Sequence, residues 1–191
     1  MSTHSAVLLD PAQSRPRLEV RRRAIAHVAR QPVLVVQPRR GRPAAALVDV
    51  LLAHDLDPAV VPADSESLPD PAALPLAILV GPDSLSEARA DGRLERELEW
   101  IRRADEAGTA VIGIGHGARA LALAFGGSVA RAARPLRGWA MVDTVVPHVI
   151  ASGPWLTWQH DVITLPAGAV SLAHNRLGPQ AFRLGRHLGV Q

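Results

Sequence analysis

Residues 111–127 decide the fold of this chain: Val-Ile-Gly-Ile-Gly-His-Gly-Ala-Arg-Ala-Leu-Ala-Leu-Ala-Phe-Gly-Gly. They predict a buried strand, a sharp glycine turn and a helix, which is the layout of a nucleophile elbow. Such a turn is strained and packs closely against its neighbours, so it needs small residues around its tip, and Gly113 and Gly117 supply them. The tip, where an elbow carries an exposed Ser or Cys, is Gly115. The pattern therefore predicts the scaffold of a catalytic site that has lost its nucleophile.

Composition limits the class of protein further. A chain of 191 residues that is 48% hydrophobic can bury one sizeable core, and no apolar run is long enough to span a membrane. Cysteine is absent, which excludes disulfides, thiolate metal sites and a cysteine nucleophile. No export signal is visible, so we expect a cytoplasmic protein.

The basic residues are unusual because all 21 are arginine, although the formal net charge is only +3. Skewed codon composition and a surface for nucleic acid or an acidic partner both explain this bias. The modest charge and the lack of a nucleic-acid-binding motif argue against nucleic acid. Residues 1–31 are interpreted as an Arg-rich arm with a short amphipathic helix over 18–30, which Pro32 ends. That helix is either a solvated surface helix or a docking element for an acidic partner.

From residue 32 onward, apolar runs of strand length alternate with helical periods. This alternation predicts a three-layer α/β sandwich with a mostly parallel central sheet covered on both faces. The predicted strands are 33–36, 59–61, 76–80 and 110–114, and the predicted helices are 44–54, 94–107 and 117–126. After Gly127 the pattern changes to short β-like pieces, which predict a β-rich C-terminal half: 139–146, 155–158, 169–173 and 180–184.

Three blocks, in order, resemble the class I glutamine amidotransferase family over residues 32–191. The first, Ile78-Leu-Val-Gly-Pro-Asp-Ser84, is similar to the family's Gly-Gly-Pro loop at the end of a strand. The second is the elbow itself, similar to Gly-Ile-Cys-x-Gly-His-Gln…Leu-Gly-Gly. The third joins Trp158-Gln-His-Asp161, Leu165-Pro-x-Gly168, Gln180-Ala-Phe-Arg-x-Gly185 and Gly189-Val-Gln191. The resemblance implies the family's flavodoxin-like fold.

The departures from the family concern its chemistry. In the family, a Cys at the elbow attacks the amide of glutamine, a His activates it and a Glu orients that His. The Cys position falls on Gly115, and the His-x-Glu would lie beyond Gln191, where the sequence ends. The family's His-Gln pair after the elbow is replaced by Ala118 and Arg119. The resemblance therefore implies a degenerate member without a glutaminase triad.

The resemblance also implies that the scaffold of an oxyanion hole survives. Backbone donors at Gly81 and His116 would hold a carboxylate or carbonyl without performing chemistry on it. Arg119, one helical turn from the elbow tip, either grips an anionic ligand there or pairs with a carboxylate, Asp83 or Asp161. The His116 side chain is a candidate base, metal ligand or ligand contact, but it is more simply explained as an exposed residue at a variable position.

Gln159 and His160 complete the predicted ligand-binding residues, since they replace His-Gly in the family's Trp-His-Gly-Asp block. The eight His residues show no metal-ligand spacing, so neither a metal nor a cofactor is expected. Trp139, Trp155 and Trp158 are interpreted as core and rim of the β-rich half, with an aromatic ligand shelf as the alternative.

Together these features predict a catalytically inactive amidotransferase-like protein that acts as a non-catalytic subunit or binding module beside a partner enzyme, such as a synthase. A homodimer is the other expected association, because apolar surface near Leu188 and Val190 is expected to be uncovered. Two alternatives remain open: a sensor for a small carboxylate, and an enzyme with a different mechanism that uses His116 and Arg119.

Overall fold

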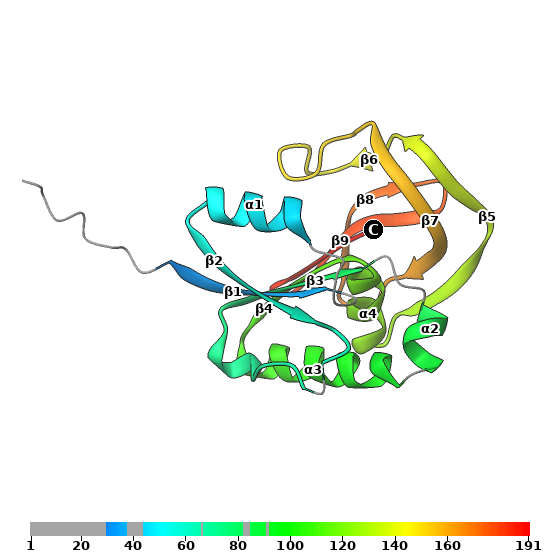
Figure 1. Ribbon diagram of the computed structural model, residues 1–191. Helices are drawn as coiled ribbons and strands as arrows, with labels where there is room; N and C mark the ends of the chain where they lie inside the picture. Colours follow the sequence, from blue (N-terminus) through cyan, green and yellow to red (C-terminus); the bar gives the residue numbers. More distant parts are fainter. Residues whose placement is uncertain (1–29, 38–43, 66, 82–84, 91) are drawn as a thin grey trace, which may run out of the picture.

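A computed structural model describes residues 30–37, 44–65, 67–81, 85–90 and 92–191 of the chain. The predicted arm helix at 18–30 lies outside these residues except for Arg30, which is not helical. In the described part of the chain the centre is an eight-stranded sheet with the order β2-β1-β3-β4-β10-β9-β8-β6 (Figure 1). Its first five strands run parallel: β2 (Leu56–Pro62), β1 (Gln31–Gln37), β3 (Leu76–Gly81), β4 (Ala110–Gly115) and β10 (His187–Val190).

Helices cover both faces of the parallel half, because its strands are apolar on both sides. Val33 and Val35 of β1 pack on the side of Leu51 in α1 (Ala45–Ala53). The alternate residues Leu34 and Val36 face the opposite side, where the larger part of the core is formed with α3 (Arg93–Ala107) and α4 (His116–Ala124). Figure 1 shows α1 on one side of the sheet and α3 on the other. The predicted three-layer arrangement is confirmed.

The main elements of this half lie close to their predicted positions. The predicted end of the helix at 94–107 is confirmed, since Gly108 caps α3 in the left-handed region with φ 84°. Two short elements were not predicted: α2 (Leu85–Ala90) and a 3-10 turn at Pro71–Ala73, whose N-cap is the side chain of Asp70. No helix in the described residues is long and apolar enough to cross a membrane.

The C-terminal half is antiparallel. It extends the central sheet with β9 (Gly178–Leu184), β8 (Val170–Asn175) and the two-residue β6 (Asp143–Thr144). Separately, β5 (Ser128–Ala140) and β7 (Trp155–Thr164) form a two-stranded antiparallel ribbon. The predicted strand at 139–146 is wrong in its extent, because β5 starts at Ser128 and ends at Ala140. After Ala140, only β6 pairs again within that range.

The expected exposure near the last strand is also wrong. Because β10 lies between β4 and β9, both of its edges are paired, and Leu188 and Val190 are half-buried. Val190 packs against a small cluster formed by Val142, Ala173 and Ala181. The large exposed apolar side chains lie elsewhere, many of them on and around the β5–β7 ribbon.

Candidate functional site

The elbow at residue 115 has the predicted geometry. Gly115 joins β4 directly to α4 with φ 61° and ψ −107°, a backbone conformation that residues with a side chain rarely adopt. A Cβ at Gly113 would lie 2.4 Å from the backbone of Gly117, and one at Gly117 would lie 2.2 Å from the carbonyl oxygen of Leu79. The prediction that the turn needs small residues on both sides is therefore confirmed in atomic terms.

The carbonyl group of Gly81 faces the tip of the elbow. A Cβ at Gly115 would lie 2.8 Å from the carbonyl oxygen of Gly81, and no other group of Gly81 except its carbonyl carbon lies within 4 Å of that point. The atom of Gly81 nearest to that point is therefore a hydrogen-bond acceptor, and the expected backbone donors at Gly81 and His116 stay a prediction. A side chain at position 115 would require the Gly81 peptide to move.

A cleft of about 540 Å³ opens beside the tip, at the carboxyl ends of the parallel strands, where ligands bind in open α/β sheets. It lies between the ends of β3, β4 and β10 on one side and strand β7 on the other. Its lining residues are Gly81, Gly115, Arg119, Arg131, Leu156, Thr157, Trp158, Gln159, His160, Asp161 and Gln191. The structure thus brings together the predicted Gly81, Gly115, Arg119, Gln159 and His160, and it leaves the His116 side chain out of the lining.

Arg119 is buried in the wall of this cleft and pairs with Asp161. Its Nη1 lies 3.6 Å from Oδ2 of Asp161, and Nη1 of the exposed Arg131 lies 3.5 Å from the other carboxylate oxygen. Burial lowers the pKa of Arg119 and the charge of Asp161 opposes that effect, so the guanidinium stays protonated at neutral pH. The ion pair that the sequence offered as an alternative to ligand binding is present, and the cleft is nevertheless open.

His116 does not lie on an exposed face, which corrects the expectation from the sequence. It is 5% exposed, and its Nε2 lies 2.6 Å from Oε2 of Glu97, which is equally buried on α3. The imidazole therefore joins α4 to α3 beneath the sheet. This position gives the side chain a structural contact and removes it from the cleft.

Two glutamine side chains add polar groups to the cleft. Nε2 of Gln159 donates to the carbonyl oxygen of Asp161 at 2.9 Å, while its Oε1 is buried without a hydrogen-bond partner among the described residues. Nε2 of Gln191 is likewise buried without one. Sequence reasoning did not select Gln191 or Arg131. The position of Gln191 next to the end of the last parallel strand was the available signal, whereas nothing in the sequence marked Arg131.

His160 is held at the rim by arginines. Its Nδ1 lies 3.0 Å from Nη2 of Arg131, and its Nε2 lies 3.4 Å from Nη2 of Arg137. Among the residues that the structure describes, no group of three His, Cys, Asp or Glu side chains is arranged to hold a metal ion.

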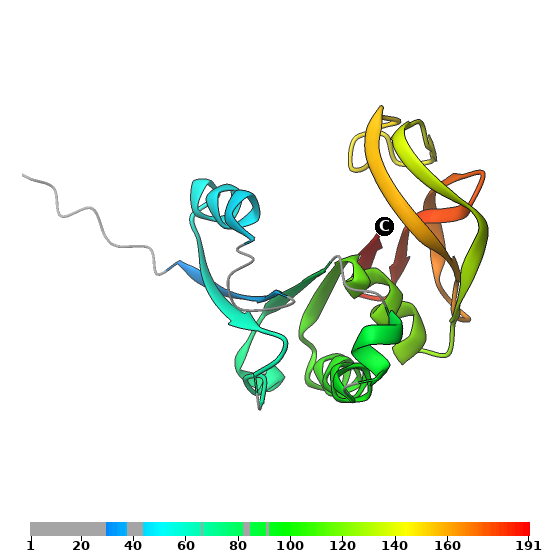
Figure 2. The same ribbon diagram turned by 45° about the vertical axis from the view of Figure 1, so that its right-hand side comes forward.

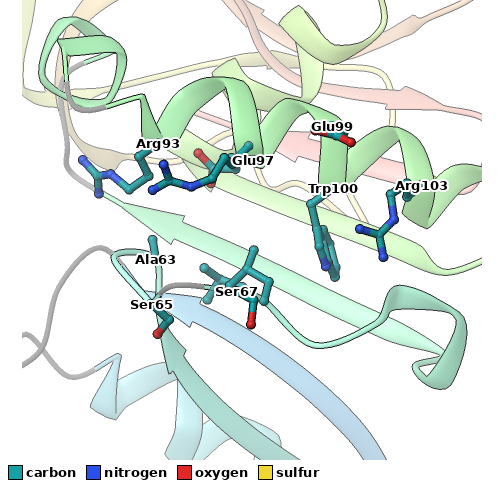
Figure 3. A pocket seen from close by; sticks show the side chains of 11 residues that line it. Ala63, Ser65, Ser67, Arg93, Glu97, Glu99, Trp100 and Arg103 are labelled. Carbon is teal, nitrogen blue, oxygen red and sulfur yellow. The ribbon is translucent and has the colours of Figure 1, made fainter.

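A second, smaller cavity of about 200 Å³ lies on the α3 side of the sheet (Figure 3). Arg93, Glu97, Trp100 and Arg103 of α3 form one wall, and residues that follow β2, including Ser65 and Ser67, form the other. Nε1 of Trp100 donates to the carbonyl oxygen of Pro69 at 2.8 Å, so this wall is fastened to the loop after β2. Glu97 lines this cavity and also bonds to His116, so the carboxylate connects the cavity wall to α4.

Comparisons with known proteins were made for the sequence and for the structure. No family model and no curated protein matches the sequence. A glutamine amidotransferase from Thermotoga maritima matches the structure with a TM-score of 0.73 at 20% identity, covering 84% of this chain and 74% of that chain. The fold is that of the glutamine amidotransferases.

Two further amidotransferase-fold structures agree. A glutamine amidotransferase from Methylobacillus flagellatus gives a TM-score of 0.69 at 24% identity, covering 85% of this chain and 69% of that chain. A protein from Thermoplasma acidophilum described as a putative GMP synthase subunit gives 0.69 at 24% identity, with 86% and 84% covered. At these identities the likeness to known glutamine amidotransferases is one of fold.

Proposed function

We propose that this protein is a binding module built on the glutamine amidotransferase fold, without glutaminase activity. The observation that carries the proposal is the elbow tip. Gly115 supplies no nucleophile there, and the carbonyl oxygen of Gly81 lies where a side chain at position 115 would begin. The sequence contains no cysteine, so no other residue can provide the thiolate of the amidotransferase reaction. What remains at the site is an open cleft with charged and polar walls.

The first prediction concerns glutamine hydrolysis. We expect the purified protein to release no ammonia from glutamine above the rate of a heat-inactivated sample, measured by a coupled glutamate assay. Gly115→Cys is expected to stay inactive as well, because its Cβ would displace the Gly81 peptide and because His160, the imidazole in the described cleft lining, is held by Arg131 and Arg137. Turnover by the parent protein would refute the proposal.

We further propose that the module works beside a partner protein, as a non-catalytic subunit of a synthase or another biosynthetic enzyme. One structural neighbour is itself described as a putative GMP synthase subunit, which is consistent with this role on a shared fold. Exposed tryptophans on the β5–β7 ribbon support the same role, because exposed aromatic surface is typical of interfaces.

A sensor for a small carboxylate is the second candidate, and one observation favours it. Two arginine side chains, Arg119 and Arg131, line the cleft against a single carboxylate side chain, Asp161, so the charged side chains of the described lining are mainly positive. An enzyme that uses His116 together with Arg119 has no comparable support, since the imidazole is bonded to Glu97 away from the cleft.

The second prediction tests the sensor. We expect calorimetric titration with glutamate to show binding that weakens about tenfold in Arg119→Ala and in Arg131→Ala, because each loses a charge-assisted contact. Loss of the buried Arg119 could disturb folding, because it leaves Asp161 with one arginine fewer. The Arg131 side chain is 66% exposed, so we expect Arg131→Ala to fold normally. Arg103→Ala, on α3 outside the cleft, serves as the matched control. Equal affinity in all four proteins, or no binding by the parent, would exclude this candidate.

A further inference from the structure

Three of the four tryptophans in the chain lie on the β5–β7 ribbon, and none of the three is a core residue, although the sequence suggested both core and rim positions. Trp139 and Trp158 are each 72% exposed, and Trp155 is 49% exposed, whereas Trp100 of α3 is buried. Side chains of this size normally bury most of their surface. Their exposure on one ribbon marks a surface that binds something.

The register of the ribbon places two of these tryptophans, Trp139 and Trp158, on one face, whereas Trp155 points to the other. Arg137 is paired with Trp158, and Trp139 is paired with Leu156, which is 71% exposed. Paired residues and those two positions apart point to the same side of an antiparallel ladder, so these four residues form one Trp–Arg face. The guanidinium of Arg137 lies 4.7 Å from the ring centre of Trp158, a cation–π contact that leaves the charge at the surface.

Strand β7 also has a free edge. Among the described residues β5 is the sole ladder partner of β7, so no strand is hydrogen-bonded along its opposite edge. Carbonyl groups of β7 are bonded by its own side chains instead: that of Trp155 accepts from Oγ1 of Thr157 at 3.3 Å, and that of Asp161 accepts from Nε2 of Gln159 at 2.9 Å. An unpaired edge of this kind is a template for another extended chain.

The free edge borders the cleft. Every residue from 156 to 161 lines it, as expected where a cleft follows a strand along its length. In both views of the ribbon diagram β5 is outermost, and β7 lies between β5 and the end of the chain, marked C (Figures 1 and 2). An extended segment placed in the cleft would therefore run beside β7 and next to Leu156 and Trp158.

The charges on this surface indicate which kind of partner binds there. Arg119 and Arg131 line the cleft and share Asp161 between them, and Arg137 adds a third guanidinium on the Trp–Arg face. A second copy of the chain would bring the same arginines against one another and is disfavoured by repulsion. A segment with carboxylate side chains would be attracted.

We propose that the free edge of β7 and the Trp–Arg face dock an extended, acidic segment of a partner protein, which pairs with β7 as a third strand of the ribbon. A polypeptide fits because its backbone offers N–H and C=O groups in alternation, as a strand edge requires, whereas the phosphate groups of lipids and nucleic acids offer acceptors alone. Apolar side chains of the segment would pack on Trp158 and Leu156, and its carboxylates, on the opposite face, would meet Arg131, which is paired with Asp161. This inference rests on the proposed role as a binding module and adds the chemistry of the partner.

The test begins with a display library of random linear peptides selected on the intact protein. We expect the selected peptides to be rich in Asp and Glu alternating with apolar residues. A fluorescent peptide from this pool should lose binding when its carboxylates are replaced by amides, or when alternate backbone nitrogens are methylated so that strand pairing fails. Hydrogen exchange of the complex should show added protection at residues 155–161.

Variants of the protein complete the test. Trp158→Ala and Arg131→Glu, both at exposed positions, are expected to weaken binding of that peptide about tenfold or more. Val50→Ala, at a position of α1 that is 54% exposed, is the matched control and should bind as the parent does.

Several results would overturn the inference: a pool without acidic enrichment, no protection on β7, or a Trp158-dependent dimer in sedimentation equilibrium. Trp158-dependent binding to phosphatidylglycerol vesicles or to single-stranded RNA, in place of the peptides, would overturn it too. The glutaminase assay separates this outcome from the proposed function. If the protein hydrolyses glutamine and binds the acidic peptides, the docking site stands and the proposed function is refuted. If it is inactive and does not bind the peptides, the proposed function stands and the docking site is refuted.

Discussion

Gly117→Ala is expected to abolish the native fold or to lower the free energy of unfolding by about 3 kcal/mol or more, because the added carbon has nowhere to go. Its Cβ would lie 2.2 Å from the carbonyl oxygen of Leu79 and 2.9 Å from the Cβ of the same residue. Leu79 is in β3, at the centre of the parallel sheet, and is 1% exposed. Neither the strand nor α4 can retreat without opening the main core.

Gly126→Ala provides the matched control for this prediction. Gly126 lies just beyond α4 with φ 88°, and a Cβ there would meet nothing within 4 Å. Alanine at that position costs only the left-handed conformation, about 1 kcal/mol. Urea unfolding followed by circular dichroism would measure both variants. Similar free energies of unfolding for the two would contradict the assignment of Gly117 to a close helix–strand contact.

The parallel half of the fold could be predicted because its sequence carries two signals at once. Apolar runs such as residues 33–36 and 76–80 are buried on both faces, and the glycines of the elbow reveal where strand and helix approach. The ribbon gave no such signal. Strand β5 is largely exposed on both faces, so it has no apolar alternation, and a bulge between Arg131 and Leu136 interrupts its register opposite His160.

The site residues whose positions could be predicted are those placed by a single strand or turn. Gly81 and Gly115 end adjacent parallel strands, so their place at one edge of the sheet follows from the topology. The contact of His116 with Glu97 could not be found, because it depends on how α3 and α4 face each other and not on any local pattern. Likewise, Arg131 reaches Asp161 only through the pairing of β5 with β7.

Glu97→Ala is the other substitution with a large expected effect, a loss of about 3–5 kcal/mol in the free energy of unfolding. Glu97 and His116 are both about 5% exposed, and the 2.6 Å contact between them is the hydrogen bond described for Nε2 of the imidazole. Removing the carboxylate leaves that nitrogen buried without a partner and enlarges the cavity between α3 and the loop after β2.

A double-mutant cycle separates the contact from the packing. When Glu97→Leu and His116→Leu are combined, neither side chain is left as a buried polar group without a partner. The double variant should therefore be more stable, by about 1 kcal/mol or more, than the sum of the two single changes predicts. Glu99→Ala is the matched control: this residue lines the same cavity (Figure 3) but is exposed, and its loss should cost less than about 0.5 kcal/mol. Additive single changes, or a Glu97→Ala variant as stable as Glu99→Ala, would mean that the pair contributes nothing. His116 would then be available for another role, and the case for a purely structural imidazole at the elbow would fall.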